Sequence, residues 1–147
     1  MENTHEVYVN LEIAEMLKKA GFNWKCHASY QNGEFTEFRY SSYFKVLIMD
    51  FNNAPDYMNQ YSAPSLDVAQ RWLREVKGYY IDWEFNMNIG SCGQELYDFT
   101  DISVYIFVAG TQGNICKCKL EENYTTIEKA QEAGIKKALE LILEKGE

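Results

Sequence analysis

The chain contains four cysteines and two histidines, the side chains best suited to metal binding and nucleophilic attack. Cys116 and Cys118 lie two residues apart on an expected strand, so both would point to one face and could supply half of a four-ligand zinc site. Cys26 and Cys92 lack the paired spacing of structural zinc modules. We therefore expect no metal and no cofactor, and interpret the cysteines as reduced thiols packed in the interior.

Other catalytic patterns are also incomplete. Cys26 and His27 are adjacent, but neighbours on a strand point to opposite faces and cannot share a proton. Asp82 and Glu84 share the polar face of an alternating strand, a pattern that a solvated surface also produces. The glycines match neither a phosphate loop nor a dinucleotide fingerprint. We expect a non-enzymatic protein; an enzyme of unrecognised mechanism using Asp82, Glu84 and His27 is the third alternative.

Aromatic residues are unusually frequent, with eight Phe, eleven Tyr and three Trp. Tyrosine combines an apolar ring with a polar tip, so it suits both a half-buried sheet and a recognition surface. The net charge of −8 opposes generic binding to nucleic acid and to anionic membranes. These observations predict an aromatic, acidic surface that recognises a partner.

The length and hydropathy predict one domain over residues 1–147, with a flexible N-terminus at 1–8. No stretch approaches the roughly 20 apolar residues that cross a bilayer. The first six residues are polar and acidic, unlike a secretion signal. We expect a cytoplasmic protein.

The elements that must position these side chains mix helix and sheet. Helices are expected at 10–20, 65–77 and 125–142, the last opened by a capping box of Thr125 and Glu128. Gly134 and nearby alanines allow this helix to approach the sheet closely. Strands are expected at 22–30, 35–40, 43–51, 79–87, 102–109 and 115–120, with Asn32-Gly33 as a hairpin turn. The pattern predicts an α+β fold, in which an antiparallel or mixed sheet of about five to six strands packs against three amphipathic helices.

The segment 52–63 is the longest expected loop and a candidate binding lip. Exposed tyrosines would bind a protein without a deep pocket, whereas a concave site of rings and arginines would sequester a nucleotide-like small molecule. Edge strands and short helices are compatible with a homodimer. The candidate binding residues for the first two alternatives are Tyr57, Tyr61, Tyr79, Tyr80, Arg39, Arg71 and Arg74.

Four stretches carry a resemblance to other proteins: Leu11 to Phe22, Ala63 to Val76, the aromatic strand after Gly78, and Glu128 to Leu139. They resemble small uncharacterised proteins encoded by phages and prophages of Bacteroides-type gut bacteria. The resemblance covers most of the chain, rests on structural motifs and brings no site residues. It implies an accessory protein in the cytoplasm of a bacterial host, where such a protein would block a host or defence factor.

Overall fold

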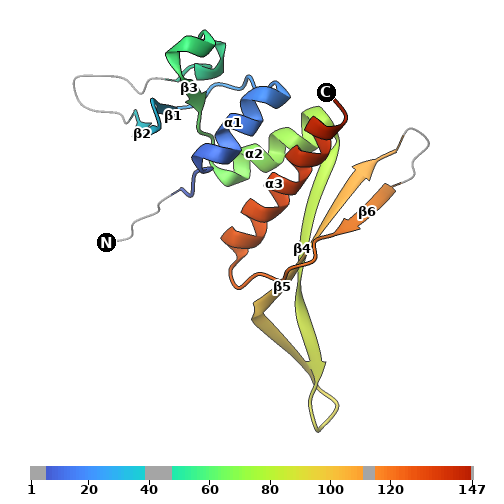
Figure 1. Cartoon of the computed structure of the whole chain (residues 1–147). Helices are drawn as coiled ribbons and strands as arrows, with labels where there is room; N and C mark the ends of the chain where they lie inside the picture. Colours follow the sequence, from blue (N-terminus) through green and yellow to red (C-terminus); the bar gives the residue numbers. More distant parts are fainter. Residues whose placement is uncertain (1–5, 39–47, 111–114, 147) are drawn as a thin grey trace, which may run out of the picture. The chain divides into compact units, whose positions relative to one another are not determined.

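The structure, a computed structural model, describes residues 6–38, 48–110 and 115–146, with the backbone alone for 115–117 (Figure 1). The chain divides into two compact units, which we call unit 1 (Met1–Ala69 with Leu139–Glu147) and unit 2 (Gln70–Ala138). The described residues form three α-helices and two three-stranded antiparallel sheets. The α+β class is therefore confirmed.

The arrangement of the strands differs from the expected single sheet. In one sheet the strand at residues 60–62 pairs with the strand at residues 28–31. In the other sheet the strand at residues 79–89 pairs, within the described residues, with the strand at residues 95–109. The helix α2 (Leu66–Trp72) lies between the strands of the two sheets in the chain.

Unit 1 contains α1 (Leu11–Ala20), which begins and ends where the sequence predicts. The Asn10 side chain accepts a hydrogen bond from the Ile13 N–H, and Gly21 ends the helix at a φ of 95°. One face is fully buried, as the apolar spacing requires. Its buried residues are Ile13, Ala14, Leu17 and Ala20.

The first sheet has the order β2-β1-β3, from β1 (Ala28–Gln31), β2 (Glu34–Glu37) and β3 (Gln60–Ser62). Asn32 and Gly33 occupy the turn with φ angles of 54° and 83°, which confirms the predicted hairpin. The first strand is shorter than expected, since at Cys26 there is one isolated bridge to Met49.

The expected strand at 43–51 is not found in its described part, and residues 43–47 lie outside the described residues. Ile48 and Met49 are exposed rather than buried on both faces, and residues 51–53 form a 3₁₀ helix, η1 (Phe51–Asn53). The following segment is also more regular than a loop, with a second 3₁₀ turn, η2 (Asp56–Met58), before β3. Asn52 holds this segment, because its side chain donates to the Phe22 carbonyl and accepts from the Ser62 N–H.

The N-terminal expectation of flexibility does not extend to residues 7 and 8. The Val7 carbonyl accepts a hydrogen bond from the Leu66 N–H, and Tyr8 forms an isolated bridge with Ser65. The start of α2 therefore has a backbone partner.

Unit 2 contains the second sheet, of order β4-β5-β6, from β4 (Tyr79–Ile89), β5 (Glu95–Ala109) and β6 (Ile115–Lys119). After α2 the chain makes one π-helical turn, η3 (Leu73–Lys77), and Gly78 ends it at a φ of 75°, as predicted. The cap of α3 (Ile127–Glu144) is corrected by one residue, since the Thr126 hydroxyl, rather than Thr125, accepts from the Lys129 N–H.

The first part of α3, residues 127–138, lies on one face of the second sheet. Gly134 packs so closely there that a Cβ added to it would stand 2.5 Å from Ile81 Cγ2 and 3.3 Å from Val104 Cγ1. At this position the helix approaches the sheet closely, which the small residues allow. In the described residues, no helix is long and apolar enough to cross a membrane.

Candidate functional site

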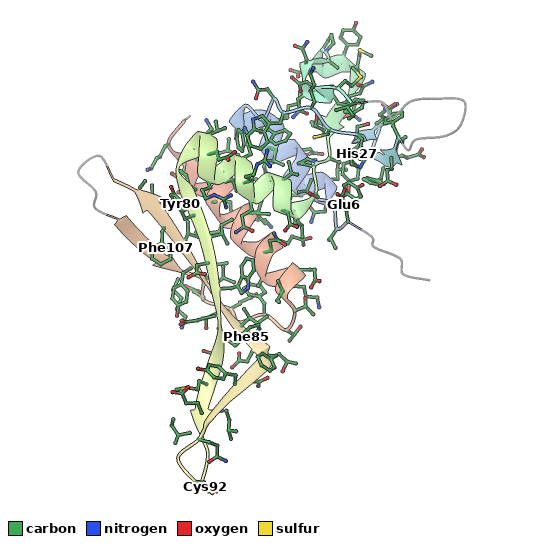
Figure 2. All side chains as sticks on the ribbon, turned by 180° about the vertical axis from the view of Figure 1, so that it is seen from behind. Glu6, His27, Tyr80, Phe85, Cys92 and Phe107 are labelled. Carbon is green, nitrogen blue, oxygen red and sulfur yellow. The ribbon has the colours of Figure 1, made fainter. Side chains whose placement is uncertain are left out.

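The hairpin of β4 and β5 is much longer than the rest of its sheet. β6 pairs with β5 only at residues 105–109, whereas β4 and β5 pair as far as Ile89 and Glu95. We call residues 86–101 the arm; it extends beyond the N-terminal end of α3, with Cys92 at its tip (Figures 1 and 2). Within the described residues no further strand pairs with the arm. Two-stranded ribbons are marginally stable by themselves, so such an arm gains from a partner.

The arm begins at a break in the β4–β5 register. Phe85 pairs with Ile102, but Asn86 pairs with Asp98, so residues 99–101 bulge out of β5. The Phe99 ring packs edge-on against Phe85 at a centroid distance of 4.8 Å. The Asn86 side chain donates to the Asp101 carbonyl at 3.0 Å, which fixes the bulge. The bulge is therefore an ordered junction between the sheet and the arm.

One face of the arm continues the face of the sheet that α3 covers. Side chains alternate along β4, so Met87 and Ile89 point to the same side as Ile81, the residue against Gly134. Tyr97 joins them from β5, since cross-strand partners share a face. Ile81 is buried, while Ile89 is 64% exposed and Phe99 is 65% exposed. The apolar stripe thus runs past the helix that buries it, leaving large apolar groups in water.

The charged residues in this part of the sequence are all acidic. From Gly78 to Cys116 the sequence has five acidic residues and no lysine or arginine. Three of the acids, Glu95, Asp98 and Asp101, lie in the arm. Thr100 donates both its hydroxyl and its N–H to the Asp98 carboxylate, and these hydrogen bonds hold the pKa of Asp98 below its usual value. A partner would therefore meet apolar side chains among fixed negative charges.

The opposite face of the sheet carries a second group of rings. Tyr80 stands across from Phe107 on neighbouring strands (Figure 2). Tyr105 donates its hydroxyl to Glu84 at 2.7 Å, which raises the pKa of Tyr105. The Lys119 ammonium lies 6.0 Å from the centre of the Tyr105 ring. This face therefore combines aromatic rings with the Glu84 carboxylate and the Lys119 ammonium.

The predicted binding tyrosines are divided between the two units. In unit 1, Tyr57 is 87% exposed on η2, and Tyr61 is half-buried on β3, with Lys18 Nζ 5.2 Å from its ring centre. In unit 2, Tyr80 is 44% exposed, but Tyr79 is 3% exposed. The expectation of an exposed Tyr79 is wrong, because this residue is in phase with the buried Ile81 on β4. Tyr57 and Tyr80 present their rings to solvent.

Two of the predicted arginines lie in the described residues. Arg71 and Arg74 lie exposed on α2 and η3, and Arg71 pairs with Glu75 one turn away at 3.4 Å. Arg39 lies outside the described residues.

The residues of the catalytic alternative are divided between the two units. His27 is in unit 1, whereas Asp82 and Glu84 are in unit 2, where Asp82 accepts from the Trp83 N–H. His27 instead lies beside Tyr8 and Glu6 (Figure 2). Burial and a hydrogen bond to Glu37 raise the pKa of Tyr8. A tyrosine held protonated in this way is a poor base, and we interpret the cluster as anchoring the N-terminal segment to the β1–β2 hairpin.

The described cysteines behave as structural or surface thiols. Burial, with a smaller effect of Asp50, raises the pKa of Cys26 to about 12, which suppresses the reactive thiolate. Cys92 is exposed and Cys118 is half-buried, and the side chain of Cys116 lies outside the described residues. The described residues contain no group of three or more acidic, histidine or cysteine side chains that could hold a metal ion.

Comparison with protein-family models, curated protein sequences and solved structures gives no match. The candidate site therefore rests on the chain's own geometry.

Sequence reasoning missed the arm. It placed the start of the β5 strand at residue 102, because residues 95–101 mix acids with apolar residues and break the alternation at the bulge. One feature of the sequence does mark this region, namely the 39-residue stretch from Gly78 to Cys116 that contains no lysine or arginine.

Proposed function

We propose that this chain is a non-enzymatic binding protein whose arm recognises a basic region of another protein. The observation that carries the proposal is the uncovered apolar stripe of the arm, formed by Met87, Ile89 and Tyr97 and flanked by Glu95 and Asp98. Fully burying one such side chain contributes about 1.5–3 kcal/mol, so three of them can drive binding. The absence of basic residues around them selects a partner of opposite charge and steers its approach.

The aromatic face around Tyr80 lies on the same two strands, on the side opposite to the apolar stripe, and offers a second contact surface. Tyr80 and Phe107 lie on the sheet, and the arm begins six residues further along β4. Aromatic side chains are enriched at protein interfaces because they bury a large area with little loss of rotamer freedom. We place the interaction surface on β4 and β5, where the sequence alone suggested scattered tyrosines. A host or defence factor, inferred from the phage-type resemblance, remains the proposed biological partner.

Binding to a defined basic peptide tests this function. The probe is an eight-residue peptide in which lysine and valine alternate, labelled for fluorescence anisotropy and titrated with the full chain. We expect saturable binding that weakens as salt rises, because screening reduces the attraction of exposed charges. The same peptide with glutamate in place of lysine should bind at least tenfold more weakly.

A pair of variants identifies the binding surface. Replacing Met87 and Ile89 together by serine should weaken binding at least tenfold, because the apolar contact is lost. Replacing Asn88 alone by serine changes the opposite face of the same strand, keeps the Asn86 side chain that holds the bulge, and should leave binding within about twofold. If the wild type and the Met87/Ile89 variant bind the peptide equally well, the arm is not the binding surface.

A further inference from the structure

The arm exposes backbone as well as side chains, at the outer edge of β4. In an antiparallel pair, alternate residues direct both their N–H and C=O groups away from the neighbouring strand. The Ile81 carbonyl accepts a hydrogen bond from the Gln70 side chain, and the Gly90 N–H donates to the Gln94 carbonyl of the opposing chain. Odd-numbered residues of β4 therefore face outward and even-numbered residues face β5.

Two of the outward backbone groups near the helices are already occupied, the Ile81 carbonyl and the Trp83 N–H. Gln70 donates to Ile81 at 3.2 Å and is itself held by Gln131, while the Trp83 N–H donates to the Asp82 carboxylate at 3.0 Å. These side chains block the edge as natural sheets commonly do. In the arm the protection stops: within the part of the chain that the structure describes, Met87 and Ile89 have no such partner for their outward groups.

We infer that this open edge binds an extended segment of the partner as an added β-strand alongside residues 85–89. The inference rests on the proposed function and specifies how the partner is held. A strand laid there would place alternate side chains against Phe85, Met87 and Ile89 on the apolar face. Its remaining side chains would lie beside Glu84, Asn86 and Asn88 on the other face.

The charge of the arm decides between two possible occupants. A second copy of this chain would bring another Glu84 and another acidic arm, with its own Glu95 and Asp98, against the first. Like charges opposite each other destabilise strand pairing, whereas lysine or arginine opposite Glu84 favours it. The edge therefore suits a segment that alternates apolar and basic residues.

N-methylation of the peptide tests the added strand without altering the protein. The valines of the alternating peptide direct their N–H groups to one edge of the extended peptide, and the lysines direct theirs to the other edge. One peptide is N-methylated at every valine and a second at every lysine. Strand addition predicts that only one of the two loses binding by tenfold or more, and which one reports a parallel or antiparallel orientation. Equal behaviour of the two peptides, whether both bind or both fail, would overturn the inference.

Proline at position 87 provides the matching test on the protein. Met87→Pro removes an outward N–H without breaking the β4–β5 ladder, and Met87→Ala removes the side chain alone. We expect Met87→Pro to bind the peptide about tenfold more weakly than Met87→Ala. Hydrogen exchange of the Gly90 N–H, which should stay protected in both variants, shows that the hairpin persists. Equal affinities with a protected Gly90 would refute strand addition.

The outcomes separate the two proposals. A wild-type chain that does not bind the unmodified basic peptide would count against the proposed function itself. If binding is lost in the Met87/Ile89 serine variant but is unchanged by N-methylation of the peptide and by Met87→Pro, the proposed function stands and the added strand is rejected. A wild-type dimer in sedimentation that Met87→Pro converts to a monomer would assign the edge to a second copy and overturn the choice of a basic partner.

Discussion

Replacing Gly134 by alanine perturbs the contact between α3 and the second sheet at one atom. In a helix interior this substitution ordinarily stabilises by about 0.8–1 kcal/mol. Here the new Cβ would stand 2.5 Å from Ile81 Cγ2, a distance that real Cβ atoms essentially never show. Ile81 is branched at its own Cβ and cannot swing this methyl group away at low cost. One neighbour, the helix or the sheet, must move.

The two effects have opposite signs, and overpacking is the larger. Adding a methyl group to a well-packed core costs about 1–3 kcal/mol. Subtracting the gain in helix propensity leaves a destabilisation of about 1 kcal/mol for Gly134→Ala. Urea unfolding monitored by circular dichroism measures this change as a lower midpoint at an unchanged m-value.

A double-mutant cycle with Ile81→Ala isolates the contact. Ile81→Ala alone should cost about 2–5 kcal/mol, because it leaves a cavity. In that background the 2.5 Å clash is gone and the nearest side-chain atom is Val104 Cγ1 at 3.3 Å, so Gly134→Ala should change sign and stabilise by up to about 1 kcal/mol. The coupling energy between the two sites would then be about 2 kcal/mol. Stabilisation by Gly134→Ala in the wild-type background would refute the close packing described for this contact.

Three further predictions concern single side chains. Thr126→Ala should lower the free energy of unfolding by about 1 kcal/mol, while Thr125→Ala should change it by less than about 0.5 kcal/mol, since Thr126 caps α3. Asn52→Ala should cost about 1–3 kcal/mol in the same urea assay, because two buried backbone groups lose their partner. Iodoacetamide at pH 8 should label Cys92 and spare Cys26, whose pKa of about 12 leaves almost no thiolate, as peptide mass spectrometry would show. Labelling of both at similar rates would contradict the burial of Cys26.

Local features of the chain could be predicted from the sequence because they depend on a few neighbouring residues. Asn10 and Gly21 bound α1, and Asn32-Gly33 forms its turn, since cap and turn geometries follow from side-chain length and permitted φ angles. The alternation of β4 was also correct from Tyr79 to Phe85, because a strand buried on one face imposes a period of two, whereas Met87 is exposed in the arm. The acidic and aromatic character of the candidate surface follows from composition.

The tertiary structure decided which of these elements meet. No local pattern states that six strands divide into two sheets, because pairing between distant segments depends on loop closure and packing over the whole chain. The place where α3 ends likewise decides which residues of the β4 stripe are buried. Ile81 and Ile89 belong to one alternating series, yet Ile81 is buried and Ile89 is exposed. The apolar character of this stripe follows from its residue types alone. The position of the helix and the bulge after Phe85 determine that the last part of the stripe is exposed in the arm.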